Sequence, residues 1–397
     1  MSPPVAEVVS LGCRLNIAES ETIRAMVAGR DMVVVNSCAV TNEAVKQTRA
    51  AIRRAARERP GAEIVVTGCA ATIDPAGFTA MAEVARVVPN ADKLAPAAWQ
   101  TSAPPPASFA GHARAFVEVQ NGCDHSCTFC IIPQGRGASR SSPAGAVIER
   151  VRALVEAGHR EVVLTGVDLT SYGPDLPGAP TLGLLVERIL HHVPALERLR
   201  LSSLDSVEID DRLFAIVTQE PRVMPHLHLS LQAGSDLILK RMKRRHTRAQ
   251  SVALVERLLA VRPDIAIGAD LIAGFPTEDE GMFADTLALI ADAHIVHAHI
   301  FPYSARTGTP AARMPQVAPE LRRERAGRLR AAANAARRAW LASLVGTRQA
   351  MLVERPGDRG HAPNFASITC DAVAEPGSVR DVRITGTTDT GLIGSMT

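Results

Sequence analysis

Three short apolar runs near the start of the chain each end at a cysteine, and this recurrence constrains the fold more than any other feature. The runs precede Cys13, Cys38 and Cys69, and helical patterns cover residues 18–28 and 43–59 between them. The order strand–helix–strand–helix–strand predicts a parallel sheet with right-handed crossovers. All three cysteines should then lie at the carboxyl ends of strands, the edge at which open α/β sheets hold ligands.

Two interpretations of this first cysteine set are open. Free cysteines pack well as small hydrophobes, so the three could be ordinary buried residues. Because they occupy equivalent strand ends, we favour convergence on a shared metal–sulfur cluster. A [4Fe–4S] cluster normally takes four thiolates, so three would leave one iron open.

A second set, Cys123, Cys127 and Cys130, lies within one short segment, with steps of four and then three residues. Three thiolates from one loop again indicate a [4Fe–4S] cluster with an open iron. A structural zinc site is the alternative, but such sites usually add a second cysteine pair or histidines, and no second pair follows here. The spacing resembles that of the radical S-adenosylmethionine (SAM) superfamily. That resemblance implies that the open iron binds SAM and that the reduced cluster cleaves it to a 5′-deoxyadenosyl radical.

Composition narrows the possible partners and compartment. The chain has 397 residues and a formal net charge of only +3, so any nucleic-acid affinity must come from local patches. No apolar run is long enough for a membrane helix, and the first residues lack the pattern of a secretory signal. Seven cysteines outside any disulfide-like framework suit a reducing cytoplasm, which we expect to be the location.

The middle of the chain alternates strand-like and helical patterns, which predicts a partial (β/α)6 barrel with its chemistry at the carboxyl ends of the strands. The cysteine loop at 123–130 follows the first of these strands, where such a site is expected. The strand-like runs cover residues 115–120, 161–165, 198–201, 226–231, 265–272 and 297–301.

Strand-end segments of this barrel are candidate SAM contacts. Backbone groups after the second strand could pair with the methionyl amine, and serines after the third lie where ribose hydroxyls are expected. A glycine after the fifth strand would let adenine approach the backbone, although a strand-end glycine is often only a turn. The candidates are Thr165, Gly166, Asp168, Ser202, Ser203, Gln232 and Gly274.

Two further features indicate RNA binding. Basic runs at 240–248 and 321–338 are each typical of a solvated helix face, but together they suggest a polarised surface for phosphates. Short strands separated by Gly, Pro and Asp turns follow, at 349–354, 364–369, 381–385 and 391–394. This pattern predicts a small OB-like β-barrel, in which Cys370 is a buried structural residue.

The combination resembles the methylthiotransferase family over nearly the whole chain. Its cysteine motifs are similar to Ser10-Leu-Gly-Cys-Arg-Leu-Asn, Val35-Asn-Ser-Cys-Ala-Val-Thr, Thr67-Gly-Cys-Ala and Gln120-Asn-Gly-Cys-Asp-His-Ser-Cys-Thr-Phe-Cys, followed by Arg136-Gly-Ala-Ser-Arg-Ser. The resemblance implies two [4Fe–4S] clusters and SAM as cofactors. The auxiliary cluster would be held by Cys13, Cys38 and Cys69 and would hold or activate the sulfur to be inserted. The radical cluster would be held by Cys123, Cys127 and Cys130. The small β-barrel resembles the family's TRAM domain.

His226 and His228 would share one face of the fourth barrel strand. Two histidines without a third ligand indicate a polar barrel lining more than a metal site. The family usually has proline where this chain has Ser230, which weakens residue-level transfer along that strand.

The residues around Cys38 and Cys123 look most like the branch that acts on N6-threonylcarbamoyladenosine at tRNA position 37. This implies conversion to the 2-methylthio derivative, with the tRNA anticodon loop, an electron donor such as flavodoxin or ferredoxin, and a sulfur donor as partners, and no membrane. Sister branches modify N6-isopentenyladenosine in tRNA or an aspartate of a ribosomal protein. An iron–sulfur or zinc RNA-binding protein without catalysis is the competing class.

These patterns divide the chain into four parts. Residues 1–100 form the predicted N-terminal α/β domain, and a linker rich in Pro and small residues covers 101–114. Residues 115–344 form the predicted radical SAM domain, and 345–397 the TRAM-like RNA-binding domain.

Overall fold

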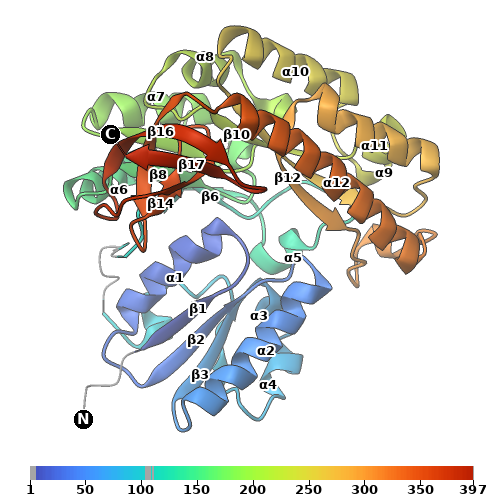
Figure 1. Ribbon diagram of the computed structural model, residues 1–397. Helices are drawn as coiled ribbons and strands as arrows, with labels where there is room; N and C mark the ends of the chain where they lie inside the picture. Colours follow the sequence, from blue (N-terminus) through green and yellow to red (C-terminus); the bar gives the residue numbers. More distant parts are fainter. Residues whose placement is uncertain (1–5, 103–108, 110, 397) are drawn as a thin grey trace. The chain divides into compact units, whose positions relative to one another are not determined.

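The computed structural model describes residues 6–102, 109 and 111–396 (Figure 1). It contains two compact units, each assembled from separate stretches of chain. One unit comprises residues 1–110, 121–140 and 304–312, and the other comprises residues 111–120, 141–303 and 313–397. Most of the predicted linker, residues 103–108 and 110, lies outside the described residues, as do the first five residues.

The N-terminal unit is built on four parallel strands in the order β1-β2-β3-β4. Val33, Val34 and Val35 of the second strand are fully buried, as expected for a parallel sheet covered on both faces. The strands are β1 (Glu7–Ser10), β2 (Met32–Ser37), β3 (Glu63–Gly68) and β4 (Arg86–Val87).

Two long helices cover opposite faces of this sheet (Figure 1). Helix α1 (Arg14–Met26) packs Ile23 against one face, and α2 (Asn42–Glu58) packs Ile52 against the other. The predicted parallel sheet is therefore confirmed. The remaining helices of this unit are α3 (Cys69–Ile73), α4 (Pro75–Thr79), η1 (Pro96–Trp99) and α5 (Ile132–Arg136), with η4 (Pro310–Arg313) at its edge.

The second unit contains six parallel strands that match the six predicted runs. They form two sheets, β5-β8-β9 and β10-β11-β12. Isolated β-bridges link the two sheets, one between Leu199 and Val223 and one between Leu204 and Leu229. The predicted partial barrel is confirmed. The strands are β5 (Ala115–Glu118), β8 (Glu161–Thr165), β9 (Arg198–Leu201), β10 (His226–Gln232), β11 (Ala266–Ala273) and β12 (Ile295–Pro302). Short strands β6 (Gln120–Asn121) and β7 (Arg140–Ser141) pair as a separate two-stranded sheet.

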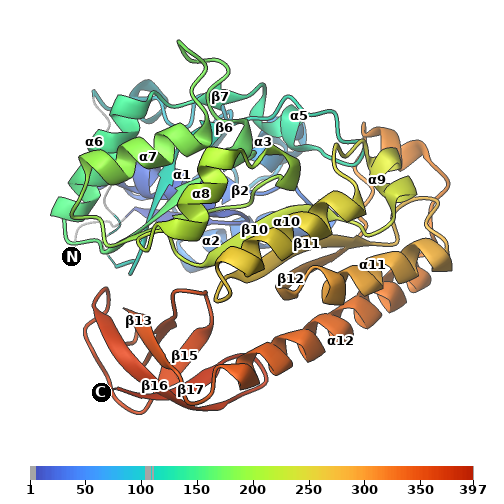
Figure 2. The ribbon, with the colours of Figure 1, turned by 90° about the horizontal axis from the view of Figure 1, so that it is seen from above.

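Helices alternate with these strands, and Figure 2 shows α10 and α11 running along the β10–β12 sheet. Their inward faces are apolar, with Leu254, Leu258 and Phe283 buried. The helices are α6 (Ala144–Glu156), η2 (Leu169–Ser171), α7 (Leu182–His192), η3 (Ser206–Glu208), α8 (Asp211–Gln219), α9 (Asp236–Met242), α10 (Arg248–Val261) and α11 (Glu280–Asp292).

A long helix, α12 (Pro319–Ser343), leads into a closed C-terminal barrel with strand order β13-β14-β15-β17-β16 (Figure 2). Cys370 lies in the core of this barrel, beside Met351 and Ile368, as predicted. The strands are β13 (Arg348–Glu354), β14 (Arg359–His361), β15 (Ser367–Cys370), β16 (Val379–Thr387) and β17 (Leu392–Met396).

The sequence pattern misplaced one strand of this barrel and missed another. The strand predicted from residue 364 begins at Ser367, because Phe365 has a φ of 68°, which extended backbone does not allow. Strand β14 is only three residues long and gave no periodic signal. Within the described part of the chain, no helix combines the length and apolarity required to cross a membrane.

Candidate active site

The first cysteine set lies at the carboxyl edge of the N-terminal sheet, as predicted. Cys13 caps α1 after β1, Cys38 follows β2, and Cys69 begins α3 directly after β3. Ser37 and Gly68 are register partners, so the next residues, Cys38 and Cys69, emerge from neighbouring strands at the same level.

Two glycines allow these loops to approach one another. Gly12 has a φ of +93°, and a Cβ placed on it would lie 2.7 Å from Sγ of Cys38. Gly68 also has a φ of +93°, and its Cβ would meet the carbonyl oxygen of Ser37 at 2.5 Å. Any other residue would be strained at both positions, so the close packing of the cysteine loops depends on glycine.

The electrostatics of the first set favour a bound cation. Burial raises the pKa of Cys38 and Cys69, and negative charge on Cys13 would raise both further. Positive charge on Arg136 acts in the opposite direction at both thiols. Thiols in this situation ionise when a metal displaces their protons, so the donor set fits a thiolate-bound metal–sulfur cluster.

A buried ionic network lies next to these cysteines and was not predicted from sequence. Glu19 binds Arg136 at 2.8 Å and Lys93 at 2.5 Å, and the three side chains are each 1% exposed. Arg136 also donates to Asn16 at 2.5 Å and to Asn121 at 2.9 Å. Although burial alone would raise it, the charges of Lys93 and Arg136 lower the pKa of Glu19 to about 2.

This network joins both cysteine motifs. Asn16 lies three residues after Cys13 and within 3.9 Å of its sulfur, whereas Asn121 lies two residues before Cys123. Arg136 ends the helix that follows Cys130, and it is the cation that connects the two asparagines. The only local signal was that these residues stand inside the quoted motifs.

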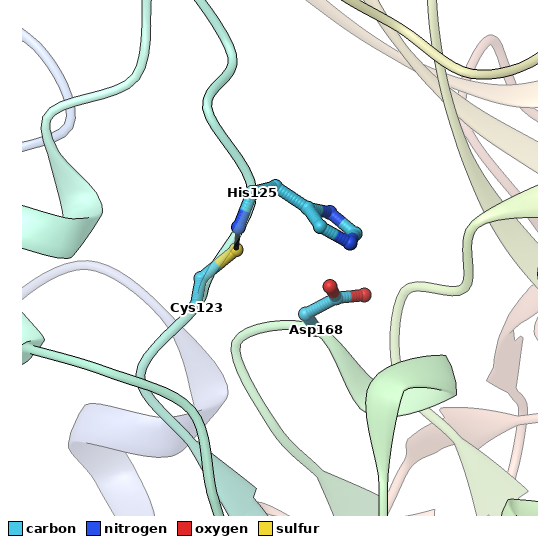
Figure 3. Close-up of side chains that lie close together, drawn as sticks. All are labelled: Cys123, His125 and Asp168. Carbon is cyan, nitrogen blue, oxygen red and sulfur yellow. Dashed lines mark hydrogen bonds between the residues drawn. The ribbon is translucent and has the colours of Figure 1, made fainter. Parts of the chain in front are cut away.

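The second cysteine set lies on a half-buried loop in which backbone amides donate hydrogen bonds to two of the cysteine sulfurs. The amide of His125 donates to Sγ of Cys123 at 3.4 Å, as Figure 3 shows, and the amide of Ile132 donates to Sγ of Cys130 at 3.4 Å. Amide donors stabilise the negative charge of cluster-bound thiolates and tune their cluster. This donor set also fits an iron–sulfur cluster.

The loop is closed by the chain that returns after α5. The amide of Cys123 donates to the carbonyl of Gly137 at 3.1 Å, and Asp124 accepts from the amide of Ser139 at 3.0 Å. A Cβ on Gly122 would lie 1.9 Å from the carbonyl oxygen of Ala138, so only glycine fits there. The amino-terminal end of the cysteine loop is therefore fixed against residues 137–139.

Of the candidate SAM contacts, Thr165 ends β8, and Gly166 and Asp168 lie in the turn that follows, which Gln120 holds. Oε1 of Gln120 accepts from the amides of Val167 at 3.0 Å and Asp168 at 2.9 Å. The Asp168 carboxylate accepts from the hydroxyls of Thr170 at 3.3 Å and Ser171 at 2.7 Å. The turn is thus preformed, and Gln120, which organises it, was not predicted.

Ser202 and Ser203 follow β9, and Gln232 ends β10. The Ser202 hydroxyl is buried and has no hydrogen-bond partner among the described residues, a costly state that a ligand would relieve. Gln232 has a φ of 68° after an irregularity in strand register, and such backbone strain is typical of functional positions.

Gly274 follows β11, but its immediate surroundings give it a packing role. It has a φ of +70°, and a Cβ on it would lie 2.3 Å from Cγ of Arg322 on α12. Its amide donates to Glu278 at 2.9 Å, and burial raises the pKa of that carboxyl to about 6. The glycine therefore admits Arg322, and contact with adenine stays a prediction.

The two basic runs are largely paired within the fold. In the first, Arg244 binds Asp205 at 2.8 Å and Arg245 binds Glu208 at 2.8 Å. In the second, Arg325 binds Glu278 at 2.9 Å and Arg328 binds Glu280 at 2.7 Å. These four arginines hold helices in place, and phosphate binding by the two runs stays a prediction.

Comparison with known proteins gives two family matches. Residues 117–290 match the Radical SAM superfamily, and residues 6–89 match Uncharacterized protein family UPF0004. The chain is 45% identical to threonylcarbamoyladenosine tRNA methylthiotransferase MtaB of Rickettsia prowazekii, over 96% of this chain and 94% of that protein. It is 35% identical to MtaB of Bacillus subtilis, over 81% of this chain and 78% of that protein.

A tRNA-2-methylthio-N(6)-dimethylallyladenosine synthase of Novosphingobium aromaticivorans is also 35% identical, over 96% of this chain and 95% of that protein. Among solved structures, the radical SAM methyltransferase TsrM of Kitasatospora setae matches with a TM-score of 0.51 and 16% identity, over 71% of this chain and 66% of TsrM. The cobalamin-dependent radical enzyme OxsB matches with a TM-score of 0.53 and 10% identity, over 83% of this chain and 55% of OxsB. At these identities the two structures support the fold alone.

Proposed function

Because this chain belongs to the radical SAM methylthiotransferase family, we propose that it converts N6-threonylcarbamoyladenosine at position 37 of tRNA to its 2-methylthio derivative. The substrate assignment is supported by 45% identity to a threonylcarbamoyladenosine enzyme, against 35% for a dimethylallyladenosine enzyme. MtaB of Bacillus subtilis is 35% identical as well, so the assignment against isopentenyladenosine (dimethylallyladenosine) depends on the Rickettsia prowazekii relative.

The observation that carries the proposal is the presence of two three-cysteine sets within one compact unit. Cys13, Cys38 and Cys69 would hold the auxiliary cluster, and Cys123, Cys127 and Cys130 the radical cluster. Bound there, the radical cluster and SAM would supply the radical, SAM would also supply the methyl group, and the auxiliary cluster would hold the sulfur that comes from a sulfur donor. A non-catalytic RNA-binding protein would not require two open-iron sets.

The chain's own residues would orient SAM and stabilise charge. Gln120 fixes the turn at 166–168, and Thr165 and Gly166 beside it would contact the methionyl group. Ser202 offers a buried hydroxyl to the ribose, with Ser203, Gln232 and Gly274 at neighbouring strand ends. Arg136 keeps a permanent positive charge near the first cysteine set: burial alone would lower its pKa, but the charge of Glu19 and the hydrogen bond to it raise the pKa well above its usual value.

The C-terminal barrel would bind the tRNA anticodon stem-loop. Arg348 on β13 and Arg383 on β16 are register partners, both are exposed, and neither forms an ion pair among the described residues. Like charges directly opposite one another destabilise a sheet, so an anionic partner is expected at this position. Phosphate groups of RNA would provide that charge.

The proposed reaction also requires partner molecules. Radical generation requires an electron donor such as flavodoxin or ferredoxin, and sulfur insertion requires a sulfur donor. We also propose a cytoplasmic location and the division into domains at 1–100, 115–344 and 345–397, with the linker at 101–114.

Anaerobic reconstitution followed by nucleoside mass spectrometry tests the proposed reaction. The enzyme would be incubated with SAM, a reductant and anticodon stem-loops carrying either threonylcarbamoyladenosine or isopentenyladenosine. We expect 5′-deoxyadenosine together with the 2-methylthio product of the threonylcarbamoyl substrate. Product from the isopentenyl substrate alone would move the enzyme to the sister branch, and absence of 5′-deoxyadenosine with both clusters loaded would exclude radical catalysis.

A further inference from the structure

Three polar side chains from neighbouring strands meet inside the second unit. Nε2 of His228 lies 3.0 Å from Oδ1 of Asp270, and Nδ1 of His299 lies 3.3 Å from the same oxygen. The two imidazole rings are 4.5 Å apart and tilted by 37°. Although burial alone would raise it, hydrogen bonds from both histidines hold the pKa of Asp270 well below its usual range. This triad was not predicted.

The fold makes room for the triad. Asp270 and His299 are register partners on β11 and β12, so their side chains share a face. His228 is the register partner of Gly268, and a Cβ on Gly268 would lie 2.5 Å from Nδ1 of His228. Any side chain at 268 would displace His228 from Asp270, so the glycine allows the arrangement.

On the amino-terminal side of the triad, the interior of the barrel is covered by the C-terminal barrel. His226 and His297 lie two residues earlier on the same strands, with their rings 5.3 Å apart. Phe365 of the C-terminal barrel packs 4.9 Å from His226, and the carbonyl of Asn364 lies 3.3 Å from Nε2 of His297. The His299 side chain, in contrast, is 60% exposed. The triad therefore faces the carboxyl half of the barrel, where (β/α) barrels bind substrates.

An exposed aromatic ring continues this surface. Phe301 lies two residues after His299 on the same face of β12 and is 37% exposed. Among the described residues it is the one Phe, Tyr or Trp that is exposed to this degree. A single exposed ring is ordinary, but a ring next to an oriented histidine offers both stacking and hydrogen bonding.

We propose that Phe301 and His299 receive the substituted adenine, with the base stacked on Phe301 and its N6 substituent hydrogen-bonded to His299. This inference rests on the proposed function and assigns the residues that select its substrate. Asp270 and His228 act through His299 and are positioning residues.

The chemistry of the triad fits a polar substituent. With Nδ1–H donated to Asp270, Nε2 of His299 is left to accept a hydrogen bond from the substrate. A threonylcarbamoyl group has urea N–H and hydroxyl donors for that nitrogen, whereas an isopentenyl group has none. A site built to hydrogen-bond one substituent discriminates against an analogue that leaves its polar atom unpaired.

The test compares His299→Phe, His299→Gln and Phe301→Ala in cluster-reconstituted enzyme, with His191→Phe on α7 as the matched control at an exposed histidine. Two stem-loop RNAs would be used, one with threonylcarbamoyladenosine and one with isopentenyladenosine. We expect His299→Phe to raise the KM for the threonylcarbamoyl RNA about tenfold, as for one lost hydrogen bond, with a smaller change in kcat. Selectivity between the RNAs should fall by a similar factor, and the glutamine variant should retain part of it.

Phe301→Ala should weaken binding of both RNAs by a similar factor of about tenfold, because stacking does not depend on the substituent. Iron content and RNA-independent 5′-deoxyadenosine formation, both unchanged, would show that the variants fold. Unchanged selectivity in His299→Phe, with an active wild type, would overturn this inference and leave the proposed function intact. A wild type inactive on the threonylcarbamoyl RNA would overturn both. One equivalent of zinc in reconstituted wild type, absent from Asp270→Asn, would instead make the triad a metal site and overturn the inference.

Discussion

Each compact unit contains a buried glutamate that contacts at least two cationic side chains, and the groups around Glu19 and Glu161 differ in what they connect. In the N-terminal unit, Glu19 binds Arg136 and Lys93, and the cluster continues through Asn16 and Asn121 to both cysteine motifs. In the second unit, Glu161 binds Arg200 at 2.7 Å and Arg114 at 2.9 Å. The first cluster lies beside the proposed cofactor ligands.

The Glu161 cluster instead attaches the C-terminal barrel. Arg200 donates to the carbonyls of Pro363 at 2.7 Å and Ala362 at 2.9 Å, and Arg198 donates to the carbonyl of Ala350 at 2.6 Å. Arg114 binds Glu354 of β13 at 2.5 Å. A buried carboxylate that orients arginines thus lies beside the proposed cofactor ligands in one unit and attaches the C-terminal barrel in the other.

The largest effect is expected from Arg136→Met. This change leaves Glu19 buried with Lys93 as its remaining cation, and breaking a buried pair costs about 3–5 kcal/mol. Chemical denaturation of anaerobic holoenzyme measures the free energy of unfolding. Arg54→Met, which removes an exposed pair with Glu58 at 4.0 Å, is the control and should change it by less than about 1 kcal/mol. Equal losses in the two variants would contradict a structural role for the buried cluster.

Arg200→Met is expected to lower the free energy of unfolding by about 2–3 kcal/mol, because two barrel carbonyls lose their donor. The loss should appear as weaker RNA binding and faster proteolysis of the C-terminal barrel, while RNA-independent 5′-deoxyadenosine formation continues. Arg212→Met, at an exposed pair with Glu187, is the matched control. If 5′-deoxyadenosine formation falls as far as RNA binding, the ionic groups around Glu19 and Glu161 do not have separate roles.

The barrel junction should also weaken in mild acid. Burial, with the charge of Arg337, lowers the pKa of His297 from 6.5 to about 3. Below pH 6.5, His297 therefore binds a proton in the unfolded chain but stays neutral in the folded protein. The free energy of unfolding falls as the pH drops from 6.5 toward about 3. The pKa of Glu161 is about 2 against 4.5, so its contribution is lost only below pH 4.5.

Unfolding followed at pH 7.5 and 5.5 separates these two groups. Wild type should lose about 1 kcal/mol over this range from His297 alone. His297→Asn should remove that dependence, and an equally steep dependence in the variant would refute the assignment to His297.

The smallest effect is expected from Arg348→Ala and Arg383→Ala on the C-terminal barrel. Each should weaken RNA binding a few-fold and reduce the slope of log affinity against log salt by about 1. Stability should stay the same or rise slightly, because two like charges face one another in the wild type. An unchanged salt dependence would remove these arginines from the RNA interface.

Much of this architecture could be predicted because it is local in sequence. Apolar runs followed by helical patterns gave the strands and placed Cys13, Cys38 and Cys69 at strand ends. The buried clusters could not be predicted in this way. Arg136 and Glu19 are 117 residues apart, and no periodicity indicates which buried charges will pair.

The His228 triad illustrates the same limit. The alternation of His226 and His228 predicted a shared face, but the partners of His228 lie on two later strands and depend on strand register. Gly268 could have served as a signal, since a strand-interior glycine often marks a close approach. The boundary of β15 was wrong because the left-handed conformation of Phe365 has no pattern in the sequence.

The most direct test of the central claim replaces each cysteine set separately. We expect the triple alanine variant of Cys13, Cys38 and Cys69 to keep about half of the iron and still form 5′-deoxyadenosine, but to yield no 2-methylthio product. The triple alanine variant of Cys123, Cys127 and Cys130 should form neither. The account would be contradicted if the first variant still yielded the 2-methylthio product, or if the second still formed 5′-deoxyadenosine.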